Sequence, residues 1–148
     1  MQQVPIQQQL RNVSFVYQII KILKENELAL FKDSDLTDAI ILLSNKYREA
    51  RRKNSSHDIK QIESFCASPR LQKIIDQLII DLPNLEPKHL SLIAFSCHTL
   101  KVDSKKAEPL ARALALQAQK NISSFSPKEL LNLTNAFLHV LSRARTIS

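Results

Sequence analysis

The sequence predicts an all-α protein, an α-solenoid of about three helical hairpins of roughly 40 residues each, with one short extra helix. The chain has no glycine among its 148 residues, and tight strand turns depend on residues that reach positive φ at low cost. The segments LEPKHL, from Leu85, and FSPKEL, from Phe125, lie 40 residues apart and share a proline, a lysine and a final leucine. The alternative is an ordinary helical bundle in which the prolines align by chance.

The spacing of these segments divides the chain into units. We interpret the chain as a single domain over residues 1–148 that begins with a flexible N-terminus over 1–12. The helical-hairpin units are expected at about 13–54, 69–106 and 107–148, with an insert over 55–68.

The first unit lacks the prolines, so its prediction depends on apolar periodicity. Val13, Val16 and Leu23 lie on one face of a first helix. Asp33 or Ser34 could cap the second helix, because short polar side chains accept hydrogen bonds from free N–H groups at a helix start. The first unit therefore has the same helix–turn–helix pattern as the others.

The insert accounts for 14 extra residues between the first and second units. We expect it to form the short extra helix, beginning at Ser56 or Asp58 and ending at Ser68-Pro69. Its inward side chains would be Ile59, Ile62 and Phe65.

Prolines preceded by Ser or Glu mark the expected helix starts in the second and third units. Proline fits the first helical turn, where its missing N–H has no partner to lose, and the preceding Ser or Glu can cap the helix. Ser126 and Glu129 have the spacing of a capping box, in which each side chain accepts from the other residue's N–H. Helices are therefore predicted to begin at Pro69, Pro87, Pro109 and Pro127.

The apolar residues of these two units correspond in position. In the first helices, Ile74, Ile75 and Leu78 match Leu114, Ala115 and Ala118. The second helices match over the following positions: Leu90, Ile93, Cys97 and Leu100 with Leu130, Leu133, Phe137 and Val140. These spacings are typical of one buried helix face.

Basic residues gather at the ends of the second helices. The chain has 21 Lys plus Arg against 14 Asp plus Glu, a net charge of +7, which suits an anionic partner such as nucleic acid. In a stack of hairpins, equivalent connections lie along one edge. We count ten basic residues on that edge, Lys46 and the nine candidates named below, against two acidic residues, Glu49 and Asp103, which gives a net charge of +8. The candidate RNA-binding residues are Arg48, Arg51, Arg52, Lys53, Lys101, Lys105, Lys106, Arg143 and Arg145.

Two interpretations of this charge are open. Lys and Arg at helix C-termini stabilise the helix dipole by about 0.3 to 1 kcal/mol each. The segment YREARRKN, however, places four bases in six residues, and such a cluster is more typical of contact with a polyanion. Phosphate contacts of this kind give affinity without sequence information. Base stacking is not expected, because Tyr17 and Tyr47 are the only tyrosines and the Phe residues mostly fall at core positions.

The segments FSPKELLNLTNAFLHVL, residues 125–141, and LEPKHLSLIAFSCHTL, residues 85–100, resemble octotricopeptide-type helical repeats, as in FAST-kinase-like and RAP-domain proteins. The resemblance extends over 69–143 and, weakly, over 28–46. It implies RNA binding in mitochondria or plastids. The Pro-Pro-Pro-Glu-Trp stretch of many such repeats is missing, as is any Trp.

Several chemistries lack their sequence motifs. Without glycine there is no phosphate-binding loop. His57, His89, His98 and His139 have no zinc-site spacing with Cys66 or Cys97. No apolar run approaches the roughly 20 residues of a membrane helix. We therefore expect a protein that is not an enzyme, with no cofactor, no metal and no membrane span.

The leading prediction is an RNA-binding protein that contacts the phosphate backbone through its basic edge. The expected setting is a mitochondrial ribonucleoprotein, such as the mitochondrial ribosome or an RNA-processing factor; plastid or cytoplasm are less favoured. The alternative is a protein–protein interaction scaffold or a structural subunit of a mitochondrial complex.

Overall fold

The structure, a computed structural model, describes residues 4–135 and 138 of the chain. In this part of the chain the secondary structure is entirely helical, so the all-α prediction is confirmed. The α-helices are α1 (Ile6–Arg11), α2 (Val16–Glu25), α3 (Asp35–Arg52), α4 (Ser56–Cys66), α5 (Pro69–Asp81), α6 (Pro87–Thr99) and α7 (Ser104–Lys120), followed by a helical segment over 127–135. Short 3-10 helices occupy the turns: η1 (Leu28–Leu30), η2 (Leu82–Asn84) and η3 (Ile122–Ser124).

Three of the four proline starts are confirmed. Pro69 and Pro87 are the first residues of α5 and α6, and the last described helix begins at 127. The predicted capping box is present: the Ser126 N–H donates to Glu129 Oε1 at 2.8 Å, and the Glu129 N–H donates to Ser126 Oγ at 3.2 Å. The sequence thus marked these starts correctly.

The capping role expected of the residues before Pro69 and Pro87 is wrong. Neither Ser68 nor Glu86 accepts a hydrogen bond from the first turn through its side chain. The Ser68 hydroxyl donates backwards to the Phe65 carbonyl at 2.6 Å. The Glu86 carboxylate instead lies 3.5 Å from Lys88 Nζ. Proline alone therefore defines these two starts.

The helix start predicted at Pro109 is also wrong. α7 begins at Ser104, with Pro109 inside it. The cap is Asp103, whose carboxylate accepts from the Lys105 N–H at 3.1 Å. A well-capped start one turn earlier, with Ala107 and Leu110 buried behind it, outweighs the hydrogen bond that proline cannot donate.

The first unit and the insert form the expected helices, with three differences. Val13, expected on the first helix, lies before α2. Ser34 is the N-cap residue of α3, but no side chain caps this start, so the capping role expected of Asp33 or Ser34 is wrong; the Ser34 hydroxyl donates to Asp38 Oδ2 at 3.1 Å. The extra helix α4 begins at Ser56, with Ile62 and Phe65 buried and Ile59 half-buried. The segment expected to be a flexible N-terminus contains α1, whose Ile6 is buried in the common core. Two apolar side chains, Ile6 and Leu10, on a helix of six residues give too weak a periodic signal to be recognised.

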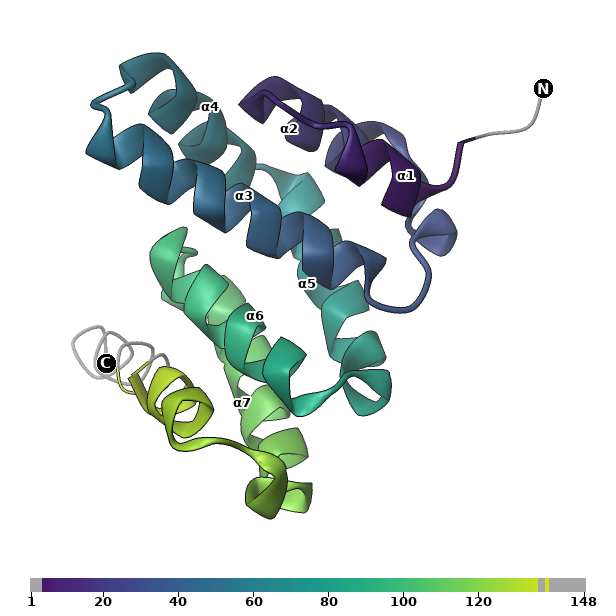
Figure 1. Cartoon of the computed structure of the whole chain (residues 1–148), viewed down its shortest axis with the longest axis vertical. Coiled ribbons are helices and arrows are strands. Elements are labelled where there is room, and N and C mark those ends of the chain that lie inside the picture. Colours follow the sequence, from purple (N-terminus) through teal and green to yellow (C-terminus); the bar gives the residue numbers. More distant parts are fainter. Residues whose placement is uncertain (1–3, 136–137, 139–148) are drawn as a thin grey trace.

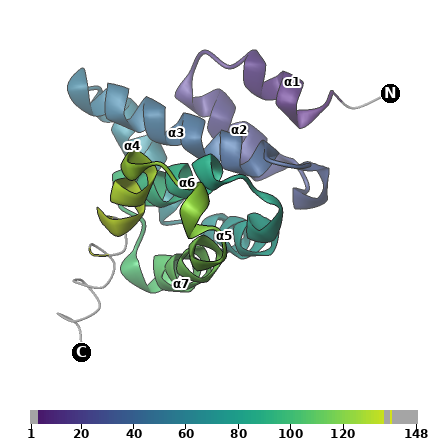
Figure 2. The ribbon, with the colours of Figure 1, turned by 60° about the horizontal axis from the view of Figure 1, so that its bottom comes forward.

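The helices pack in two layers (Figure 1). In one layer α3 packs against α6. Behind it α5 packs against α7, which Figure 2 shows side by side. The insert helix α4 contacts both α2 and α5, as well as α3. α4 therefore packs between α2 and α5, which are the first helices of the first two units.

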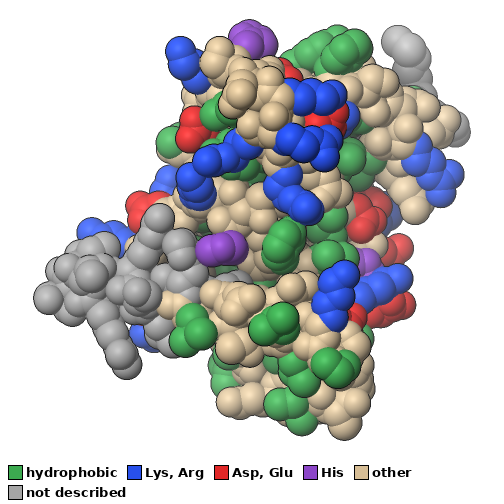
Figure 3. Space-filling model, turned by 60° about the vertical axis from the view of Figure 1, so that its left-hand side comes forward, with side chains coloured by type: hydrophobic (Ala, Val, Ile, Leu, Met, Phe, Trp, Pro, Cys, Tyr) green, Lys and Arg blue, Asp and Glu red, His purple; other side chains and the backbone are tan. Residues whose placement is uncertain are grey.

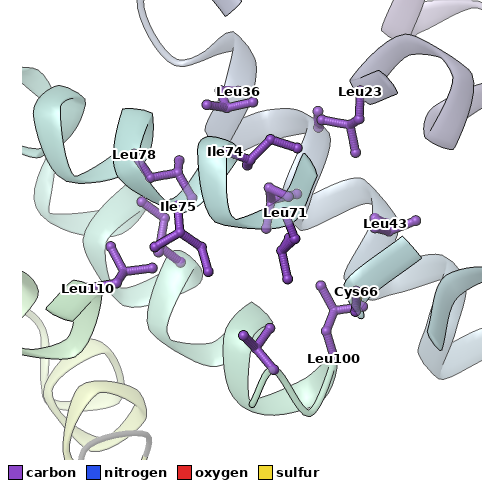
Figure 4. Packing of buried hydrophobic residues seen from close by; sticks show 14 of the residues in the cluster. Leu23, Leu36, Leu43, Cys66, Leu71, Ile74, Ile75, Leu78, Leu100 and Leu110 are labelled. Carbon is purple, nitrogen blue, oxygen red and sulfur yellow. The ribbon is translucent and has the colours of Figure 1, made fainter. Parts of the chain in front are cut away.

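α5 is at the centre of the core. Leu71, Ile74, Ile75 and Leu78 are at most 2% exposed, and Figure 4 shows them between neighbouring helices, with Leu110 of α7 on one side. One continuous cluster of buried side chains joins α1 to the helix at 127–135. Among the described helices, none is both long and apolar enough to cross a membrane.

Candidate nucleic-acid interface

The C-terminal end of α3 presents four of the predicted residues together. Arg48, Arg51, Arg52 and Lys53 are all exposed. The helix ends in a Schellman motif: the N–H of Ser55 donates to the Ala50 carbonyl at 2.9 Å, with Asn54 at φ 55°. Because helix C-termini carry partial negative charge, bases are favoured here whatever their further role.

Arg48 and Arg51 contact aromatic rings, which do not neutralise their charge. Arg48 lies over the Phe95 ring of α6, 5.4 Å from its centroid, and Arg51 lies 5.8 Å from the Tyr47 ring centroid. An aromatic face attracts a cation without neutralising it. Among the described residues, Arg48, Arg51 and Arg52 form no ion pair.

Glu49 is a carboxylate within this basic cluster, and it pairs with two lysine side chains. It accepts a hydrogen bond from Lys53 Nζ at 2.8 Å, and Lys46 Nζ lies 3.9 Å away. The hydrogen bond and charge of Lys53, together with the charge of Lys46, hold the pKa of Glu49 below its ordinary value. Two lysines pair with this carboxylate, and the charge of Arg52 also acts on it from beyond ion-pair distance.

The connection from α6 to α7 places the next three predicted residues. Lys101 adopts φ 54° in a second Schellman motif, in which the Val102 N–H donates to the Cys97 carbonyl at 3.2 Å. Lys105 is exposed in the first turn of α7, and Lys106 is half-buried. The charge of Lys106 acts on the Cys66 thiol, so this connection lies beside the end of α4.

The two connections lie on the same side of the molecule, on the left in Figure 1, and the α2–α3 and α5–α6 turns lie on the right. Figure 3 shows the left-hand side with Lys and Arg side chains gathered in its upper half. We name this surface the basic edge, formed by Arg48, Arg51, Arg52, Lys53, Lys101, Lys105 and Lys106. Arg143 and Arg145, also predicted to belong to it, lie outside the described residues.

Sequence reasoning missed two exposed aromatic side chains. The expectation that the Phe residues mostly belong to the core is confirmed for Phe31, Phe65 and Phe125, and Phe15, which is 59% exposed, is an exception. Phe15 stacks on Tyr17, which is 55% exposed. The signal was present in the first unit: the predicted inward stripe passes through Val16, so both of its neighbours point away from the core.

Both cysteines are free thiols in surroundings that favour the protonated form. Burial raises the pKa of Cys66 to about 12, with a further increase from the charge of Glu63. Burial raises the pKa of Cys97 to about 12 as well. Neutral thiols are poor nucleophiles and poor metal ligands. Within residues 4–135 and 138, no three His, Cys, Asp or Glu side chains cluster as a metal site would require.

Comparison with protein-family models, with curated proteins and with solved structures found no match to this chain. The resemblance to octotricopeptide-type repeats therefore stays a prediction from the residues themselves. The case for a function depends on the surface chemistry just described.

Proposed function

We propose that this chain is a non-enzymatic helical-repeat protein that binds the phosphate backbone of RNA through the basic edge. The observation that carries the proposal is the exposed trio Arg48, Arg51 and Arg52, which forms no ion pair in the described part of the chain and has only Glu49, already paired with two lysines, acting on Arg52. Like charges this close repel one another, and a polyanion relieves that repulsion.

The proposed architecture is a solenoid of stacked hairpins. Its support is the pairing of equivalent helices, α3 with α6 and α5 with α7. Stacking of this kind places the connections after α3 and α6 along one edge. Lys101, Lys105 and Lys106 would then continue the phosphate-binding surface that begins at the end of α3.

The proposed setting is a mitochondrial ribonucleoprotein, for example the mitochondrial ribosome or an RNA-processing factor. It is supported by the resemblance to organellar RNA-binding repeats and by the net charge of +7. Contacts restricted to phosphates would give affinity with little sequence preference. The protein would then hold RNA in place without selecting its sequence.

Replacing Arg48, Arg51 and Arg52 together by Ala tests the proposal. We expect weaker binding of both single-stranded and duplex RNA, measured by fluorescence anisotropy over a series of salt concentrations. Each phosphate contact contributes about 0.7 to the slope of log affinity against log salt for a single strand, so three lost contacts lower the slope by about 2.

A triple variant on the opposite edge is the matched control. Lys32, Lys88 and Lys128 are exposed near the starts of the second helices, and their replacement by Ala removes the same charge from the molecule. This variant is expected to retain most of the affinity and the slope. Equal losses for the two variants, or no RNA binding at low salt by the unaltered protein, would contradict the proposal.

A second candidate function, an interaction scaffold, is favoured by apolar side chains on the last helices. Leu116 of α7 is 63% exposed and Leu131 is 57% exposed. In a stack of hairpins, such residues fit the helices of a partner protein that continues the array. The salt series separates the two functions, because a surface that binds only protein gives no RNA affinity at low salt.

A further inference from the structure

A pair of stacked aromatic rings lies exposed at the start of α2. The centroids of Phe15 and Tyr17 are 5.9 Å apart and their planes are inclined by 12°. Both rings are more than half exposed. Large apolar side chains in water cost free energy unless a partner covers them. More than half of each residue is therefore accessible to another flat ring.

The backbone that carries the rings is fixed. Gln18 Oε1 accepts from the N–H groups of Ser14, at 2.7 Å, and of Phe15, at 2.9 Å. Lys46 Nζ of α3 donates to the Ser14 carbonyl at 3.2 Å. Val16, which lies between Phe15 and Tyr17 in the sequence, is buried. Because the backbone that carries the rings is ordered before any ligand arrives, binding loses less conformational entropy.

Two hollows meet beside Tyr17. One, of about 400 Å³, lies between the start of α2, the end of α3 and the start of α4. The other, of about 580 Å³, lies between α2 and α4. Tyr17, His57 and Gln61 line both hollows, so they form one continuous surface, which we name the α2–α4 groove.

Lysines occur at both ends of this groove. Lys46 and Lys53 line the first hollow, and Lys21, Lys24 and Lys60 line the second. The groove is also lined by three carboxylates, those of Glu25, Glu49 and Asp58, so its lining has more positive than negative side chains. Cations along a groove with aromatic faces at its centre are the arrangement that binds single-stranded nucleic acid, since phosphates meet the charges and unpaired bases stack on the rings.

From this geometry we infer that the α2–α4 groove binds a short unpaired segment of RNA, with bases stacked on Tyr17 and Phe15. The inference rests on the proposed function, because it takes RNA as the partner, and it adds a class of substrate: single strands in preference to duplexes. The bases of a duplex are already stacked on each other and present no free face. Duplex RNA would therefore contact the basic edge alone.

The test compares Tyr17→Ala with Tyr17→Phe in anisotropy titrations of a labelled single strand of about 12 nucleotides and of a duplex of equal length. Loss of the ring is expected to weaken single-strand binding by roughly 5- to 100-fold. Duplex binding and the salt slope are expected to stay unchanged, because stacking releases no counterions. Tyr17→Phe retains the ring and the affinity, and Leu116→Ala, an exposed residue outside the groove, is the surface control.

A second readout reports contact with the ring itself. The chain has two tyrosines and no tryptophan, and Tyr47 is 1% exposed. In Tyr47→Phe, the fluorescence therefore comes from Tyr17 alone. A base stacked on Tyr17 quenches this fluorescence, so single-stranded RNA is expected to quench it saturably, after correction for RNA absorption, and duplex RNA is not.

The outcomes separate the two proposals. If Tyr17→Ala binds single strands as tightly as the unaltered protein, and no quenching occurs, the groove inference is overturned and the basic edge still stands. If the Arg48, Arg51 and Arg52 variant retains full affinity and Tyr17→Ala loses it, the groove inference is supported and the edge proposal fails. If the unaltered protein binds no RNA at low salt, both are overturned.

Discussion

At the scale of single residues, a chain without glycine must close its helices with other side chains. Asn54 and Lys101 occupy the left-handed positions after α3 and α6, where glycine is usual. Asn tolerates this conformation better than Lys does. At Lys101 the strain is offset by the two hydrogen bonds of the Schellman motif and by burial of Val102. A predicted RNA-binding residue therefore also has a structural role.

The two thiols give the protein a distinct dependence on alkaline pH. In the folded state the pKa of each is about 12, chiefly because of burial. Unfolded thiols ionise near their ordinary pKa of about 8.5, so above that pH the unfolded state has lost protons that the folded state retains. The free energy of unfolding is expected to fall between about pH 9 and pH 12, by roughly 1 kcal/mol per pH unit for each thiol.

Urea denaturation across this pH range, with and without the double substitution Cys66→Ala/Cys97→Ala, measures the effect. Lys and Tyr titrate in the same range, so the informative quantity is the difference between the two proteins. The advantage of the unaltered protein over the variant should shrink as the pH rises. A difference independent of pH would show that the thiols ionise in the folded state as readily as in the unfolded one.

At the scale of elements, α7 shows how packing overrides a local signal. Pro109 is the sixth residue of the helix, where it has no N–H to donate to the carbonyl of Lys105 and its ring crowds that carbonyl. The helix persists because Leu110, Leu114 and Ala118 are buried and because α7 contacts both α5 and α6.

Pro109→Ala is therefore expected to stabilise the protein. The new N–H restores a helical hydrogen bond, and the free energy of unfolding should rise by about 1 to 3 kcal/mol in urea denaturation. Pro87→Ala is the matched control, since Pro87 is the first residue of α6 and lacks only a donor that would have no helical partner. Stabilisation by both substitutions equally would mean that helix position is not the cause.

At the scale of the whole molecule, Arg70 joins the first unit to the second. From the first turn of α5, its Nε donates to the Leu23 carbonyl at 2.9 Å and its Nη2 to the Asn26 carbonyl at 2.6 Å. These are among the last carbonyls of α2, so a half-buried cation caps that helix from a distance of more than 40 residues along the chain.

Arg70→Ala is expected to lower the free energy of unfolding by about 2 to 3 kcal/mol, because it removes charged hydrogen bonds from partly buried carbonyls. Arg70→Lys should recover only part of the loss, since one ammonium cannot reproduce the planar two-donor geometry. Chemical denaturation measures both.

Arg112→Ala provides the comparison for Arg70. Arg112 pairs with Glu108 on the same helix and is 78% exposed, and such surface pairs contribute about 0.5 kcal/mol or less. If Arg70→Ala costs no more than Arg112→Ala, the contact between α5 and α2 does not stabilise the fold.

The basic edge and the α2–α4 groove differ in how far they could be foreseen. The edge was predictable because the bases follow helix ends, and helix ends are defined by local pattern. The groove was not, because it exists only where α4 lies beside α2. Its five lysines come from α2, α4 and the C-terminal part of α3, and no spacing along the chain relates the three groups: Lys21 and Lys24, Lys60, and Lys46 with Lys53.

The sequence by itself determined the helical class, the starts at Pro69, Pro87 and Pro127, and most of the buried faces. Those properties depend on interactions between residues a few positions apart, which a repeated pattern records. Tertiary structure decided the extension of α7 through Pro109, the place of α4 between α2 and α5, and the capping of α2 by Arg70. Each depends on the free energy of contacts between distant segments, which local periodicity does not encode.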